Sequence, residues 1–163
     1  MRVFVPATIP MLEELIKDGL LMPVSGTVFS VTPSLREEYI SDDDDELAEV
    51  AIMEAARGSL RLLSAHPDVR MRRVVLAVDV EGAELRPDLD AAVLRVKEPI
   101  LLKKVASALV DLEAAEPAIA RAVEFIDAAD LGDEDAELAL GDAEDHGLAW
   151  YATQEIPFLI ELL

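Results

Sequence analysis

The sequence lacks cysteine, which excludes a disulfide framework, a cysteine-ligated zinc or iron–sulfur site and thiol catalysis. It has two histidines, no His-Glu-x-x-His pattern, and no P-loop, nucleophile elbow or dinucleotide-binding fingerprint. Its apolar runs, such as residues 20–24, fall far short of the roughly 20 residues that cross a membrane. The opening residues, with Pro6 and Pro10, suit neither a secretory nor a transit peptide. We expect a cytoplasmic protein with no metal, no cofactor and no membrane association.

Basic residues are also scarce. The chain has 14 Lys and Arg and 34 Asp and Glu, which gives a formal net charge of −20. Yet 52% of the 163 residues are hydrophobic, which is too many for a disordered tail. A chain of this length buries roughly 70% of its surface on folding. The composition therefore predicts a packed globular domain, and the simplest role of the acidic excess is to keep that domain soluble.

The charge is distributed unevenly along the chain. The net charge is −9 over residues 1–56, +3 over residues 57–104 and −14 over residues 105–163. Such acidic ends repel phosphate backbones, so we expect no direct binding of nucleic acid. The cluster of Arg70, Arg72 and Arg73 is interpreted as a solvated turn before a strand. The acidic excess would favour a basic protein partner.

Residues 1–40 contain two similar strand–helix units about 25 residues apart. Each unit has a short β-rich run, a Thr/Pro helix start and a helix, as written in VFVPATIPMLEEL and VFSVTPSLREEY. A right-handed crossover between parallel strands would bring the two helix starts to one edge of a sheet.

Residues 42–64 predict a long helix that starts at Ser41, with a run of aspartates in its first turn. Small residues, Gly58 and Ser59 among them, would allow close packing on this helix. Residues 72–112 contain a cluster of strands, and residues 116–163 indicate helices followed by an apolar tail. We predict a single α+β (or α/β) domain over residues 1–163, with a mixed sheet of about five strands, about five helices and a mainly helical C-terminal half.

Three groups of residues are candidates for chemistry, and the first lies at the two predicted helix starts. Thr8, Thr32 and Ser34 would offer free backbone N–H groups there, and Arg36 could hold a carboxylate or a phosphate. Plain helix capping is the commoner role of such residues, and no glycine-rich loop lets a phosphate approach the backbone.

The second group surrounds His146. On one continuous helix, Asp142 and Asp145 would share a face with His146, as would Trp150 and Gln154. A carboxylate could then orient the imidazole as a general base. A surface histidine beside a tryptophan that anchors the helix is the commoner arrangement, because a helix pair alone completes neither a metal site nor a catalytic site.

The third group combines Arg36 and Tyr39 with Asp79, which are polar residues near predicted strand ends. Asp79 lies in an otherwise apolar strand, where it would be a buried acid with a raised pKa or, more commonly, a solvent-facing residue. His146 and Asp79 are thus the candidate catalytic groups, and Tyr39 is a further candidate ligand contact. These two groups alone do not form a catalytic site, so the sequence does not favour an enzyme.

Four segments carry a resemblance to a known family, namely MRVFVPATIPML, VTPSLREEY, RRVVLAVDV and AEDHGLAWYATQEIP. Together they resemble a family of small uncharacterised proteins from actinobacteria, a domain of unknown function, over nearly the whole chain. The resemblance implies a cytoplasmic actinobacterial protein, and it implies no activity, cofactor or catalytic residue.

The favoured function is a non-enzymatic or regulatory protein-interaction domain. It would form a homodimer through its helices or its apolar C-terminal tail, or it would bind a basic protein. The alternative is a small-molecule binding protein or enzyme that takes an anionic or phosphorylated ligand at the first two helix starts. A third possibility is an acidic mimic of nucleic acid, which needs carboxylates at phosphate spacing along a ridge.

Overall fold

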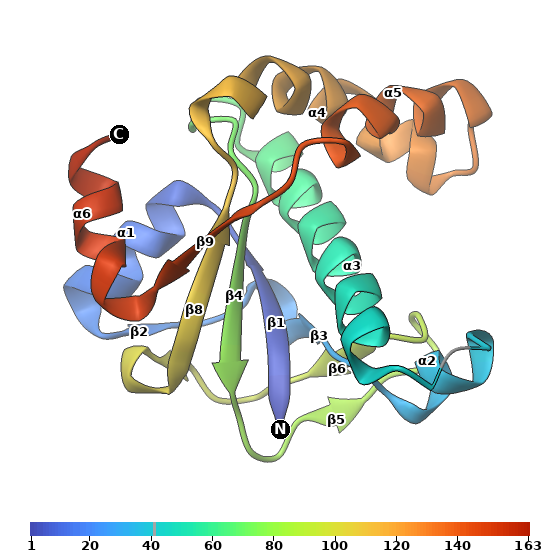
Figure 1. Cartoon of the computed structure of the whole chain (residues 1–163), viewed down its shortest axis with the longest axis horizontal. Helices are drawn as coiled ribbons and strands as arrows, with labels where there is room; N and C mark the ends of the chain where they lie inside the picture. Colours follow the sequence, from blue (N-terminus) through green and yellow to red (C-terminus); the bar gives the residue numbers. More distant parts are fainter. Residues whose placement is uncertain (41) are drawn as a thin grey trace.

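The computed structural model describes residues 1–40 and 42–163, so the predicted helix cap Ser41 lies outside the described residues. In the described part, a seven-stranded sheet forms the centre of the molecule (Figure 1). The strand order is β5 (Glu84–Leu85), β6 (Val93–Arg95), β3 (Thr27–Phe29), β1 (Arg2–Ala7), β4 (Val74–Asp79), β8 (Val105–Val110) and β9 (Ala149–Ala152). A separate two-stranded ribbon pairs β2 (Leu20–Leu21) with β7 (Ile100–Leu101).

The predicted α+β class is confirmed, and the sheet differs from the expected one in two respects. Over the described residues it has seven strands rather than about five, and its pairings are antiparallel rather than mixed. Phe4 of β1 lies opposite Phe29 of β3, so the predicted parallel crossover is wrong. After α1 (Ile9–Asp18), the chain first forms β2 and the turn η1 (Val24–Gly26), and it then enters β3 against the direction of β1.

Helices α1 and α6 (Ile156–Glu161) cover one face of the sheet. Thr8 caps the start of α1, and Gly19 ends the helix in the left-handed conformation, with φ 75°. The helix buries Leu12 and Leu15 in a core that also holds Leu76 of β4. Each fully buried side chain of this kind contributes roughly 1.5–3 kcal/mol to folding.

Helix α3 (Asp44–Ala65) crosses the other face, and the short α2 (Pro33–Glu38) precedes it (Figure 1). The small residues of α3 allow the expected close packing, because a Cβ at Gly58 would lie 3.1 Å from the Cβ of Pro6. Ser59 Oγ donates to the carbonyl of Ala7 at 2.7 Å and accepts from the amide of Val74 at 3.1 Å. This helix therefore joins β1 to β4 at one end of the sheet.

The C-terminal half is mainly helical, as predicted, and contains one strand that we did not predict. Helices α4 (Glu116–Asp130) and α5 (Glu134–Glu144) form a hairpin against the end of α3. The expected continuation of α5 is wrong, because β9 follows it and pairs with β8. Gly147 weakens the helix, and the β-prone pair Trp150 and Tyr151 completes a sheet edge instead.

The apolar tail packs on its own domain. Ile156 and Leu159 of α6 are buried in the core beside α1. Phe158 and Leu162 stay exposed at this end of the chain. Among the described residues, no helix is both long enough and apolar enough to cross a membrane.

Candidate functional site

The two predicted helix starts lie toward opposite ends of the sheet. Thr8 follows Phe4 in one direction, and Thr32 follows Phe29 in the other, because β1 and β3 are antiparallel. At about 3.3 Å per residue, this register separates the two threonines by roughly 20 Å. The structure therefore does not bring the predicted anion-binding residues into one site.

Both threonines act as helix caps. Thr8 Oγ1 accepts from the amide of Met11 at 3.4 Å, and Thr32 Oγ1 accepts from the amide of Leu35 at 3.1 Å. The Thr32 hydroxyl also donates to the carbonyl of Ala91. These bonds satisfy N–H groups that a helix leaves without partners at its start, which is a structural role.

The other candidates near the second helix start lie on or beside α2. Arg36 Nη2 donates to Asp44 Oδ1 at 2.6 Å, and both side chains are exposed. Ser34 lies in the first turn of α2, and Tyr39 follows its last residue. Arg36 is thus held by a neighbouring helix start, and the cavity that Asp79 lines is formed by other segments of the chain.

Asp79 is a solvent-exposed residue at the end of β4. Arg2 Nε and Nη2 donate to its two carboxylate oxygens at 2.9 Å and 3.3 Å. These hydrogen bonds lower the pKa of Asp79 below its ordinary value, which is the opposite of a buried acid.

His146 lies in the bend after α5 and is half-buried. Its backbone carbonyl accepts from Arg73 Nη2 at 2.8 Å. Trp150 lies on β9 and Gln154 lies in the turn that follows, so the predicted helix face with His146 does not form. Over the described residues, no group of three or more metal-ligating side chains comes together.

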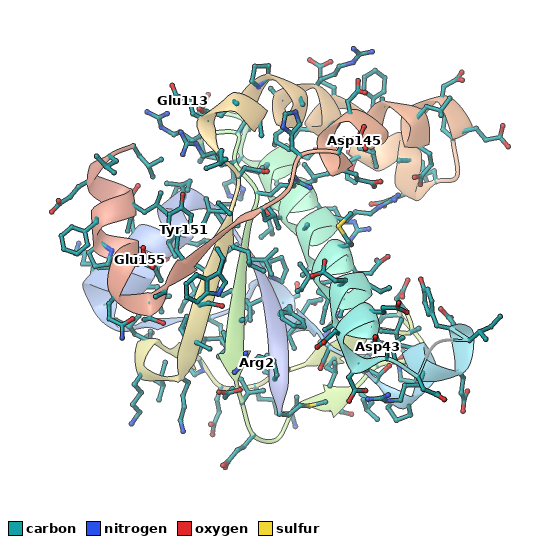
Figure 2. The ribbon with its side chains drawn as sticks, in the orientation of Figure 1. Arg2, Asp43, Glu113, Asp145, Tyr151 and Glu155 are labelled. Atoms are coloured by element: carbon teal, nitrogen blue, oxygen red, sulfur yellow. The ribbon has the colours of Figure 1, made fainter. Side chains whose placement is uncertain are left out.

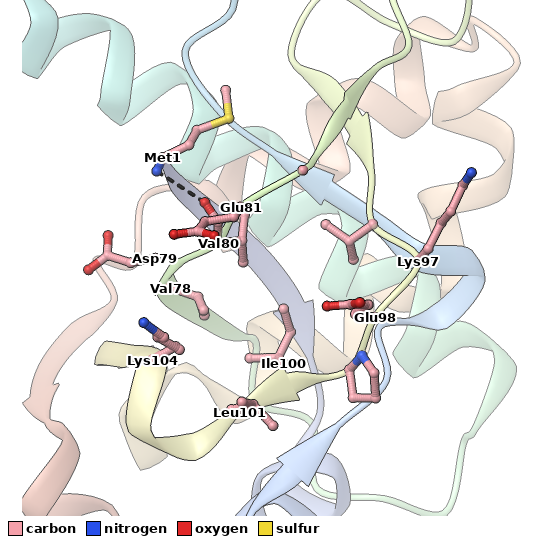
Figure 3. A pocket seen from close by; sticks show the side chains of 13 residues that line it. Met1, Val78, Asp79, Val80, Glu81, Lys97, Glu98, Ile100, Leu101 and Lys104 are labelled. Atoms are coloured by element: carbon pink, nitrogen blue, oxygen red, sulfur yellow. Dashed lines mark hydrogen bonds between the residues drawn. The ribbon is translucent and has the colours of Figure 1, made fainter.

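A cavity of about 710 Å³ lies between the end of β4 and the segment that links β6 to β8 (Figure 3). We call it the β4–β7 pocket. Its volume is in the range of small-molecule sites. It is lined by Met1, Val78, Asp79, Val80, Glu81, Gly82, Val96, Lys97, Glu98, Pro99, Ile100, Leu101 and Lys104.

The outer wall of the β4–β7 pocket is fixed at both of its ends. Gly26, with φ 68°, lies so close to Val96 that a Cβ would collide with the Val96 carbonyl. The amide of Val96 donates to the carbonyl of Gly26 at 2.9 Å. From there the chain passes through Ile100 in the β2–β7 ribbon and rejoins the sheet at Val105, opposite Val78.

Charged side chains surround the mouth of the β4–β7 pocket. Figure 3 shows the Glu98 side chain reaching into the gap between the walls, whereas Lys97 extends away from it. Lys104 lies on the same side as Asp79, and its charge helps to lower the pKa of that carboxyl. Among the described residues, neither Glu81 nor Glu98 forms an ion pair.

A buried ion pair lies at the other end of β4. Arg73 Nε and Nη2 donate to the two carboxylate oxygens of Asp111 at 2.9 Å and 2.8 Å, and the side chains are only 2% and 0% exposed. The backbone amide of Arg73 adds a third bond to Asp111, at 2.7 Å. The interpretation of this cluster as a solvated turn is therefore wrong for Arg73, and also for Arg72, which is buried beside Glu116.

The α4–α5 hairpin is held to α3 by exposed and half-buried ion pairs. Arg57 contacts Asp130 at 3.1 Å and Glu137 at 2.8 Å, and Arg61 contacts Asp130 at 2.7 Å. These contacts raise the pKa of Arg57 and lower the pKa values of both carboxyl groups. The arginines of these pairs, like the arginine of the buried pair, come from the basic middle of the chain, so they connect it to the acidic C-terminal part.

Strand β9 forms one edge of the sheet and pairs, among the described residues, with β8 alone. The amide of Ala152 donates to Glu155 Oε1 at 3.0 Å rather than to β8. Because backbone groups alternate along a strand, the N–H and C=O groups of Trp150 also face away from β8. The Trp150 side chain is 62% exposed.

The segments that flank β9 along the chain are acidic. Residues 122–163 contain 12 Asp and Glu and no Lys or Arg. Figure 2 shows Asp145 and Glu155 on either side of this strand along the chain, and Arg2 lies away from them at the lower end of the sheet. The sequence indicated the acidic character of this region, but not the strand, because we assigned these residues to a helix.

The β4–β7 pocket was also missed from the sequence. Its walls come from residues 78–82 and 96–104, which are joined by a pairing that no local pattern specifies. The one available signal was the position of the lysines, since three of the four in the chain lie at residues 97–104.

These features define a class of α+β protein with an antiparallel sheet, an exposed edge strand and a small-molecule-sized pocket beneath a crossover segment. The chain belongs to the family of unknown function DUF6912, whose family model matches residues 1–160. Comparisons with curated proteins and with solved structures give no match. The predicted membership of a family of unknown function is confirmed, and the actinobacterial source and the cytoplasmic location stay predictions.

Proposed function

We propose that the protein is a non-enzymatic interaction domain that binds a basic, extended segment of a partner protein along β9. The observation that carries the proposal is the exposed Trp150 on an edge strand whose outer backbone groups face away from the sheet. An edge strand can accept a further strand through main-chain hydrogen bonds. Tryptophan is enriched among the residues that dominate binding energy at interfaces.

The acidic residues that flank β9 along the chain, Asp145 and Glu155 among them, favour a basic partner over a second copy of the chain (Figure 2). Two copies joined at β9 would bring their acidic C-terminal parts together, which is unfavourable. A segment rich in Lys or Arg would be attracted instead. The homodimer predicted through the apolar tail would rest on Phe158 and Leu162 alone, because Ile156 and Leu159 are already buried within the domain.

The test uses two labelled peptides of equal length, one of alternating Lys and Val and one of alternating Glu and Val. We expect the Lys peptide to bind, to lose affinity as salt is added, and to shift the emission of Trp150, the single tryptophan. Trp150→Ala should weaken binding by about tenfold or more, measured by fluorescence anisotropy.

Leu138→Ala is the matched control, because Leu138 is an exposed apolar residue, 76% accessible, in the same acidic region. It should bind the Lys peptide as the wild type does. Equal binding of both peptides, or unchanged binding by Trp150→Ala, would contradict the proposal. A salt-stabilised dimer that Trp150→Ala dissociates, seen by sedimentation, would replace the basic partner with a second copy.

A further inference from the structure

We propose that the β4–β7 pocket binds a small organic cation with an apolar body. This inference is independent of the proposed interaction at β9, because the two sites share no lining residue. The ligand class follows from three properties of the pocket, which are its apolar floor, the charges left available to a ligand and the charge of the whole protein.

The floor of the pocket is apolar and fixed in place. Val78 and Ile100 belong to the main core beneath it, with 0% and 2% exposure, and the apolar surface open to a ligand comes from Val80 and Leu101. Val80 packs against the same core. Because packing against the core already holds Val80, an apolar ligand body would contact its exposed part with little cost for ordering it.

The lining carries charges of both signs, and the carboxylate of Glu98 is the one that reaches into the gap (Figure 3). Asp79 accepts two hydrogen bonds from Arg2, and Lys104 lies beside it. The Met1 ammonium group donates to the carbonyl of Val80 at 3.1 Å. Lys97 extends away from the gap, whereas Glu98 reaches into it and Glu81 lies on the facing wall (Figure 3). A cationic group between the walls would therefore meet the Glu98 carboxylate, which has no ion-pair partner among the described residues.

The net charge of −20 also favours a cationic ligand. A strongly negative protein raises the local concentration of cations and repels anions at long range. An anion would have to approach against this field and would find Glu98 in the gap. A cation with an apolar body would contact the apolar lining, pair with Glu98 and be attracted by the net negative charge of the protein.

The test compares four probes that share one apolar side chain and differ in charge. These are leucinamide as the cation, leucine as the zwitterion, N-acetyl-leucinamide as the neutral form and N-acetyl-leucine as the anion. We expect leucinamide to bind most tightly and N-acetyl-leucine least, as followed by NMR shifts of the Val80 and Ile100 amides. The affinity for leucinamide should exceed that for the neutral form by about fivefold.

Glu98→Gln should remove most of this preference for the cation while leaving the weak binding of the neutral probe unchanged. Glu13→Gln is the matched control, because Glu13 is an exposed carboxylate on α1 that does not line the pocket. Tighter binding of N-acetyl-leucine than of leucinamide would overturn the cation assignment. Absence of shifts with all four probes at millimolar concentration would overturn the pocket as a binding site.

Discussion

Residues 57–104 and residues 105–163 carry opposite net charges, +3 and −14, and they use their charged groups in different ways. The arginines at the start of the first region bind carboxylates of the second, through pairs such as Arg73 with Asp111 and Arg61 with Asp130. Lys97 and Lys104, near its end, line the β4–β7 pocket. A guanidinium group can bind both oxygens of a carboxylate in a fixed geometry, whereas an ammonium is a compact hydrated charge. The net charge of a segment therefore does not predict the charge of the surface that it forms.

The largest expected effect comes from breaking the buried contact between the two regions. Asp111→Ala should lower the free energy of unfolding by about 3–5 kcal/mol, because it leaves the buried Arg73 guanidinium without its partner. Urea denaturation measures this change. Asp79→Ala, which breaks the exposed pair with Arg2, should leave stability close to that of the wild type. Equal losses of unfolding free energy in the two variants would contradict a stronger contribution from the buried pair than from the exposed one.

A smaller effect is expected from the packing that positions the arginines of α3. Gly58→Val should cost about 1–3 kcal/mol, because the added atoms would enter the space occupied by Pro6 and Phe29. Thermal or urea unfolding measures the loss. Gly141→Val is the control, since a Cβ there meets nothing within 4 Å, and both substitutions carry the same small gain in helix propensity of valine over glycine. An equal loss in both variants would argue against close packing at Gly58.

The half-buried contact of the hairpin predicts a pH dependence. Hydrogen bonds from Arg61 and Arg57 lower the pKa of Asp130 below its ordinary value of 3.8. Its stabilising contribution is therefore present above pH 3.8 and is lost as the pH falls through the lower value in the folded state. Asp130→Asn should cost about 1 kcal/mol or less at about pH 7, after allowance for solvent screening. The difference from wild type in urea denaturation should shrink in acid, and a difference that grows there would contradict the assignment.

The smallest effect is expected within the first part of the chain, on α3 itself. Burial, followed by the charge of Asp90, raises the pKa of Glu54 above its ordinary value of 4.5. The favourable contribution of the protonated form is present below pH 4.5 and is lost as the pH rises through the raised value. Glu54→Gln should therefore stabilise the protein at neutral pH by about 0.5 kcal/mol at most, as measured by urea denaturation. Destabilisation there would mean that Arg57 and Arg61 hold this carboxylate more strongly than burial penalises it.

Local sequence patterns predicted the elements whose causes are local. Thr8 and Thr32 mark helix starts because each hydroxyl caps a backbone amide only three residues ahead. The strand at Val74–Asp79 follows from its continuous apolar composition. The α+β class followed from the order of such elements.

The remaining features depend on contacts between residues far apart in the sequence. The antiparallel direction of β3 is set by its pairing with β1 and β6, and the helix expected at Trp150 gives way to a strand because β8 offers a free edge. The burial of Arg73 likewise requires Asp111, which lies 38 residues away. The pocket could not be predicted for the same reason.

The close approach of Gly26 to Val96 has a consequence for mutational tolerance. In a saturation mutagenesis experiment, every substitution at position 26 would displace the start of the pocket wall, and the backbone there favours glycine in any case. Position 26 would therefore score as intolerant in a screen for ligand binding, although its residue has no side chain that could touch a ligand. Loss of ligand binding on substitution of this glycine would show that the shape of the pocket wall matters. Loss of binding on substitution of Glu98 would show that its carboxylate contacts the ligand.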